Sequence, residues 1–107
     1  MKQRKVFMKN TYKLIWSNEA LEGLKEIFAY LEFKFSEKDA QVFAQKLDKH
    51  LKIIQSNPET FRLSLKSKSV RRCVIAKLTS VYYTVSEESI KLITIIDNRK
   101  SPKNFIG

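Results

Sequence analysis

The feature that most constrains the fold of this 107-residue chain is a change in the spacing of its apolar residues at Asn57-Pro58. Before this point apolar side chains recur every three or four residues, which is the period of a helix buried along one face. After it, branched and aromatic residues gather in short runs that are typical of β-strands. Helices followed by consecutive strands predict an α+β domain rather than alternating β-α units.

Two amphipathic helices are predicted before Pro58. The first begins after Ser17, whose side chain can accept a hydrogen bond from an early helical amide. Its apolar stripe consists of Ala20, Leu24, Ile27, Phe28, Leu31 and Phe35, widened by Leu21, Tyr30 and Phe33. The second begins at the capping-box-like pair Ser36 and Asp39, and it ends before Pro58 because the residue that precedes a proline leaves the helical region. The apolar stripe of the second helix consists of Ala40, Phe43, Leu47, Leu51 and Ile54.

The fold expected from these elements is an N-terminal strand, an antiparallel two-helix hairpin and a three-stranded antiparallel meander. Residues 59–69 are polar and basic and are expected to form a loop. The strands are predicted at residues 12–16, 70–75, 81–85 and 90–96, with residues 86–89 joining the last two as a hairpin. The simplest packing lays the helices on one face of a mainly antiparallel sheet, places the first strand beside a C-terminal strand, and leaves the other face partly open.

Length and composition set the broad class of the protein. We expect a basic flexible arm over residues 1–10 and one domain over residues 11–107. Cys73 is the only cysteine, which excludes an internal disulfide. No apolar run approaches the ~20 residues of a membrane span, so a cytoplasmic protein without a membrane partner is expected. No cluster of His, Cys and Asp has ligand spacing, so neither a metal nor an organic cofactor is predicted.

The net charge of +10 is distributed unevenly along the chain. Residues 1–16 carry five Lys and Arg and no acidic residue, residues 17–59 carry six basic and eight acidic residues, and residues 60–107 carry ten basic and three acidic residues. The excess positive charge therefore lies at both ends of the chain, outside the predicted helices. Such a distribution favours nucleic acid, an acidic protein partner, or both, and the alternative is a merely soluble basic surface.

Several short motifs occur in a fixed order over residues 12–105. They are Ile15-Trp16-Ser17 with Ala20, Leu24 and Ile27; Asn57-Pro58; Val70-Arg71-Arg72; Val81-Tyr82-Tyr83-Thr84-Val85; and Asp97-Asn98-Arg99-Lys100-Ser101-Pro102. In this order they resemble the RelE/ParE toxins. The resemblance implies the toxin of a bacterial type II toxin–antitoxin system, neutralised by a cognate antitoxin whose flexible segment folds on binding.

The RelE/ParE family contains two mechanisms. RelE-like members cut messenger RNA on the ribosome, which requires a base, an acid and cations that stabilise the phosphate. Arg71 and Arg99 match the family's basic positions, whereas Ser80 stands where ribonucleases often have an arginine and Phe105 where they have a tyrosine. The resemblance therefore favours a ParE-like toxin that acts on DNA gyrase without hydrolytic chemistry.

A ribosome-dependent messenger-RNA endoribonuclease is the alternative, because RNA cleavage can proceed with cations and accurate alignment alone. Its candidate catalytic residues are Arg71, Arg99, Tyr82 and Tyr83. For either mechanism the candidate target-binding or phosphate-binding residues are Arg71, Arg72, Lys77, Arg99, Lys100 and Lys103. A third hypothesis is a basic nucleic-acid-binding module without toxicity, in which exposed tyrosines stack on bases.

The remaining predictions concern single side chains and assembly. Strand alternation directs Arg71 and Arg72 to opposite faces of the sheet, and likewise Tyr82 and Tyr83. His50 and Cys73 are interpreted as structural residues. The expected assembly is a homodimer or a toxin–antitoxin hetero-oligomer, with gyrase, or the ribosome and its message, as the target.

Overall fold

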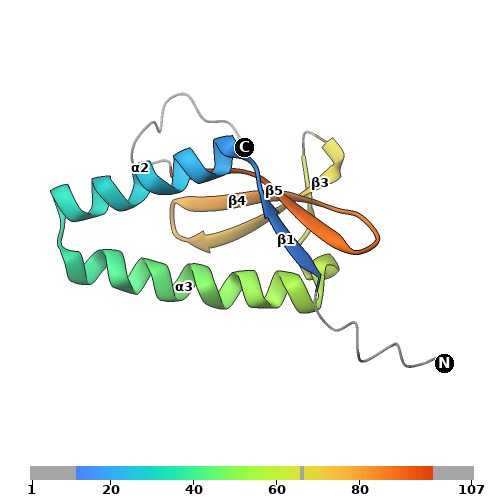
Figure 1. Ribbon diagram of the computed structural model, residues 1–107, viewed down its shortest axis with the longest axis horizontal. Coiled ribbons are helices and arrows are strands. Elements are labelled where there is room, and N and C mark those ends of the chain that lie inside the picture. Colours follow the sequence, from blue (N-terminus) through green and yellow to red (C-terminus); the bar gives the residue numbers. More distant parts are fainter. Residues whose placement is uncertain (1–11, 66, 98–107) are drawn as a thin grey trace.

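The structure is a computed structural model that describes residues 12–65 and 67–97, as Figure 1 shows. The elements follow in the order β1 (Lys13–Trp16), α2 (Asn18–Lys34), α3 (Glu37–Ser56), the 3₁₀ turn η1 (Pro58–Thr60), β2 (Leu63–Ser64), β3 (Ser67–Ala76), β4 (Thr79–Val85) and β5 (Ser89–Asp97). The predicted α+β order is thereby confirmed. The predicted arm over residues 1–10 lies outside the described residues.

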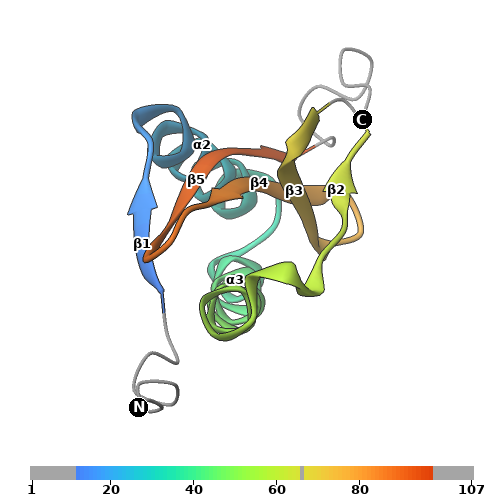
Figure 2. The same cartoon turned by 90° about the vertical axis from the view of Figure 1, so that its right-hand side faces the viewer.

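The five strands form one sheet in the order β1-β5-β4-β3-β2, which Figure 2 shows across the molecule. β1 runs parallel to β5, with Leu14 opposite Ile90, and the other neighbours are antiparallel. The prediction that the first strand lies beside a C-terminal strand is therefore confirmed. The helices run side by side as a hairpin (Figure 1), with α2 packed mainly on β5 and α3 on β3.

Both helices begin and end where capping chemistry predicts. The Ser17 hydroxyl accepts a hydrogen bond from the Ala20 amide at 2.9 Å and donates one to the Ile93 carbonyl at 2.6 Å. This second bond ties the start of α2 to β5. At the start of α3, the Ser36 hydroxyl accepts from the Asp39 amide at 3.1 Å and donates to the Asp39 carboxylate at 2.8 Å.

The apolar stripes of the helices meet one face of the sheet. The core they form with it comprises Ala20, Ile27, Leu31, Ala40, Phe43, Leu47, Ile54, Cys73, Ile75, Val81, Tyr83, Ile90, Leu92 and Ile95. The prediction was wrong for Leu21, Phe33 and Phe35, which are 42%, 84% and 54% exposed. Leu21 follows the buried Ala20 by one residue, roughly 100° around the helix. Phe33 follows Leu31 by two residues, roughly 200° around the helix, and Phe35 lies beyond the last helical residue, where helical spacing no longer applies.

The prediction of a loop over residues 59–69 was also wrong. This segment contains η1 and the two-residue strand β2, and β3 already begins at Ser67. β2 has a register irregularity against β3, and the Arg72 amide donates to the Arg62 carbonyl at 3.0 Å. β2 is defined by its pairing with β3. Its two residues carry too little local pattern for the sequence to predict a strand there.

Candidate functional site

The face of the sheet turned away from the helices, here called the open face, carries the candidate site. On β3 and β4, Arg72 lies opposite Tyr82 and Val74 lies opposite Ser80. The intervening pair Cys73 and Val81 is buried in the core. Because side chains alternate along a strand, Arg72 and Tyr82 belong to the open face.

Arg72 and Ser80 form a polar contact on this face. The Arg72 Nε donates to the Ser80 hydroxyl at 3.2 Å. Burial raises the pKa of the Tyr82 phenol, and the neighbouring Arg72 guanidinium offsets part of that rise. Tyr82 is only 8% exposed, so it cannot stack on a nucleic-acid base in this arrangement. That observation removes the main support of the hypothesis of a non-toxic nucleic-acid-binding module.

A groove of about 180 Å³ lies beside Arg72, between β2 and β3, and is called here the basic groove. It is lined by Arg62, Leu63, Ser64, Leu65, Arg72 and Val74. No ion pair within residues 12–65 and 67–97 engages either arginine. Two guanidiniums outside any such ion pair, next to apolar side chains, can hold a phosphate or carboxylate by charge-assisted hydrogen bonds.

Sequence reasoning did not single out Arg62 as a binding residue, nor Leu63 and Leu65, because it assigned them to a loop. The alternation Leu63-Ser64-Leu65 was the one available signal, and it is too short to predict a strand by itself. Leu65, at 95% exposed, lies at the margin of the groove.

Arg71 and Tyr83 occupy the opposite face of the sheet, as alternation predicted for one residue of each pair. The Arg71 Nη1 donates to the Phe61 carbonyl at 2.7 Å. Tyr83 is fully buried, its hydroxyl donates to the Pro58 carbonyl at 2.7 Å, and burial raises its pKa to about 12. Both side chains therefore hold the segment after α3 against the sheet, and neither lines the basic groove.

The other predicted binding residues do not join this groove in the described part of the chain. Lys77 is exposed in the turn between β3 and β4 and is not among the residues that line the groove. Arg99, Lys100 and Lys103 lie outside the described residues, as does Phe105. Of the predicted cations that the structure describes, Arg72 alone lines the basic groove.

His50 and Cys73 make structural contacts. The His50 Nδ1 lies 2.7 Å from the Lys46 carbonyl oxygen, and its ring is 6.4 Å from that of Phe61. Cys73 is fully buried, and burial raises the pKa of its thiol to about 12, so it remains a thiol at neutral pH. Within the described ranges there is no group of three or more His, Cys, Asp or Glu side chains that could hold a metal ion. None of the helices in those ranges is long and apolar enough to cross a membrane.

Solved structures share this fold at low sequence identity. A chain of the chromosomal ParDE system from P. aeruginosa matches with a TM-score of 0.69 and 17% identity, covering 82% of this chain and 97% of that one. The YoeB dimer from Staphylococcus aureus matches with a TM-score of 0.56 and 20% identity, covering 78% and 93%. A conserved protein from Helicobacter pylori matches with a TM-score of 0.55 and 17% identity, covering 82% and 96%.

Sequence comparison identifies the family, whereas these structural matches show the fold alone. No curated protein is significantly similar to the chain. However, the family model described as "ParE toxin of type II toxin-antitoxin system, parDE" matches residues 14–102, which include every strand and helix described above except Lys13, the first residue of β1. Because that match spans most of the sequence, the chain belongs to the ParE toxin family and is the toxin component of a type II toxin–antitoxin system, a family that implies a cognate antitoxin partner.

Proposed function

We propose that this toxin acts on DNA gyrase without hydrolytic chemistry, and that the basic groove forms part of its target-binding surface. The observation that carries the proposal is the burial of the phenol beside Arg72. Tyr82 is only 8% exposed, so its hydroxyl is hardly accessible to a bound substrate. A phenol in that position is poorly placed to exchange a proton with a ribose hydroxyl or with the leaving oxygen.

The guanidiniums of Arg62 and Arg72 remain protonated at any physiological pH. They bind negative charge and transfer no proton. Within the described residues the groove therefore has the composition of a binding surface rather than of an acid–base site. This composition supports the ParE-like mechanism over ribonuclease chemistry.

One observation favours ribosome-dependent cleavage of messenger RNA as the second candidate. Ser80 stands where ribonuclease relatives often have an arginine, yet Arg72 reaches across from β3 and brings its guanidinium to 3.2 Å from the Ser80 hydroxyl. A cation is therefore present near that position, although it comes from another strand. Cationic stabilisation with accurate alignment of the 2′-hydroxyl is the part of the chemistry that such a site can supply.

The two candidates differ in what the purified chain does to gyrase and to message. We expect it to inhibit DNA supercoiling by purified gyrase and to leave messenger RNA intact in a reaction with translating ribosomes. The opposite pattern, intact supercoiling with cleavage of ribosome-bound message, would establish the ribonuclease. Growth arrest on expression, reversed by the cognate antitoxin, confirms that the chain used is active.

A matched pair of variants tests the basic groove. Arg72→Ala should weaken gyrase inhibition by about tenfold to a hundredfold, because a hydrogen bond to a charged group contributes roughly 1.5–3 kcal/mol. Arg71→Ala removes the same side chain from the next position but from the opposite face, so inhibition should change by less than about threefold. Equal losses in the two variants, with both folded by circular dichroism, would contradict the assignment of the groove.

A further inference from the structure

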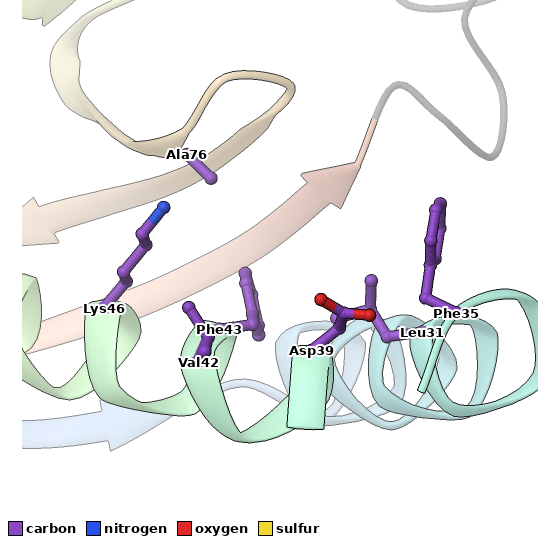
Figure 3. A pocket seen from close by; sticks show the side chains of 7 residues that line it. All are labelled: Leu31, Phe35, Asp39, Val42, Phe43, Lys46 and Ala76. Carbon is purple, nitrogen blue, oxygen red and sulfur yellow. The ribbon is translucent and has the colours of Figure 1, made fainter. Parts of the chain in front are cut away.

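A second groove, of about 240 Å³, lies on the helical side of the molecule, where the α2–α3 hairpin meets the turn between β3 and β4. It is lined by Leu31, Phe35, Asp39, Val42, Phe43, Lys46 and Ala76. Figure 3 shows Asp39 and Lys46 on either side of Val42 and Phe43 along α3. The groove thus has an apolar floor and one charge of each sign at its margin.

Exposed apolar side chains gather around this groove. Phe35 and Val42, which line it, are 54% and 43% exposed. Leu78, in the β3–β4 turn two residues after Ala76, is exposed as well. Single exposed apolar residues are ordinary, whereas a group around a groove marks an interaction surface.

Charge distinguishes between the partners that this surface could bind. Residues 17–59, which contain both helices, carry six basic and eight acidic residues, whereas the rest of the chain carries fifteen basic and three acidic residues. A strongly acidic partner gains most from the basic parts of the molecule. Two copies of a chain with a net charge of +10 repel each other, and they repel least when their balanced helical faces meet.

The two charges beside the groove are also arranged so that those of one copy can pair with those of a second copy. Asp39 and Lys46 are seven residues apart, so they lie on one side of α3, roughly 10 Å apart along its axis. Val42 lies near the midpoint between them. A two-fold axis through Val42 would set two α3 helices antiparallel, with Asp39 of each copy opposite Lys46 of the other. No ion pair within the described residues engages Lys46, which leaves its ammonium available for this contact.

We propose that this surface, centred on Val42 and bounded by Asp39 and Lys46, joins two copies of the chain as a symmetric dimer. The exposed ring of Phe35, which lines the groove, enlarges the apolar area at one end of the contact. The dimer leaves the open face and the basic groove uncovered. The proposal therefore stands independently of whether gyrase or message is the target.

Sedimentation of the purified full chain across the micromolar range tests the proposal. The wild-type chain should move from monomer to dimer as its concentration rises. Val42→Asp places a charge at the centre of the apolar contact and should leave the chain monomeric throughout. Leu65→Asp is the matched control, since it makes the same kind of change beside the basic groove and should leave the dimer intact. Circular dichroism and thermal unfolding verify that each variant is folded.

Charge reversal tests the two-fold geometry directly. Asp39→Lys sets like charges opposite each other at both ends of the contact, and Lys46→Asp does the same with the opposite sign. Each variant alone should dimerise at least about tenfold more weakly. An equimolar mixture of the two should form a heterodimer, because every pair across the axis is then again of opposite charge.

Three outcomes would overturn the proposal. The wild-type chain could remain monomeric throughout the range. Val42→Asp could dimerise as well as Leu65→Asp, which would place the contact elsewhere on the molecule. The mixture of charge-reversed variants could fail to associate although each is folded. A monomeric wild-type chain whose binding of the cognate antitoxin is abolished by Val42→Asp would assign this surface to the antitoxin instead.

Discussion

The two faces of the sheet carry different tasks. On the face under the helices, Cys73, Tyr83, Ile90 and Leu92 are completely buried. On the open face, by contrast, Val74 is 47% exposed and lines a groove with two arginines. Because the face under the helices supplies the core, side chains on the open face can serve binding without being needed for the core. The difference explains how a domain of this size combines a stable fold with a strongly basic surface.

The largest effect expected from this difference concerns stability. Ile54→Ala removes a fully buried side chain between α3 and the sheet and should lower the free energy of unfolding by about 2–5 kcal/mol. Val74→Ala on the open face should lower it by about 0.5 kcal/mol or less. Urea denaturation of both variants measures the two values. Similar losses in the two would mean that the open face contains a second core.

Alkaline pH should also lower the free energy of unfolding, through a tyrosine on the face under the helices. The pKa of Tyr83 rises from 10.0 to about 12 on burial, so between these values the unfolded chain has lost a proton that the folded chain retains. The free energy of unfolding should therefore fall as the pH rises from 10 towards 12, by about 2–3 kcal/mol from this group.

Tyr83→Phe is the control for this pH dependence. At neutral pH it should cost about 1 kcal/mol, because it removes the hydrogen bond to the Pro58 carbonyl. It should then lose less stability than the wild type between pH 10 and 12. Identical pH profiles for the two chains would show that other groups account for the alkaline loss.

The smallest expected effect compares the caps of the two helices. Ser17→Ala removes both the cap of α2 and its hydrogen bond to the Ile93 carbonyl, and should cost about 1–2 kcal/mol. Ser36→Ala removes a cap whose hydrogen bonds are exposed, and should cost about 0.5–1 kcal/mol. Thermal denaturation gives the order of the two. A larger loss at Ser36 would contradict the role of Ser17 as a link between α2 and β5.

The helices were predictable because their signals are local. A cap residue, an apolar stripe and a proline lie within a few turns of one another, so α2 and α3 begin and end close to where Ser17, Ser36 and Pro58 place them. The site was less predictable. Alternation correctly separated Arg71 from Arg72, but it could not say which of them would face the helices, since that depends on how the whole sheet packs.

Sequence by itself determined the family, the order of the elements and the division of charge between helices and the rest of the chain. These properties depend on residue types and short spacings, which are visible in the sequence without knowledge of the fold. Only the tertiary structure decided that β2 pairs with β3 and that Arg62 joins Arg72 in one groove. It also decided that Tyr82 is buried beside Arg72. Each of these contacts joins different elements of the chain, and it forms only when the sheet brings their strands together.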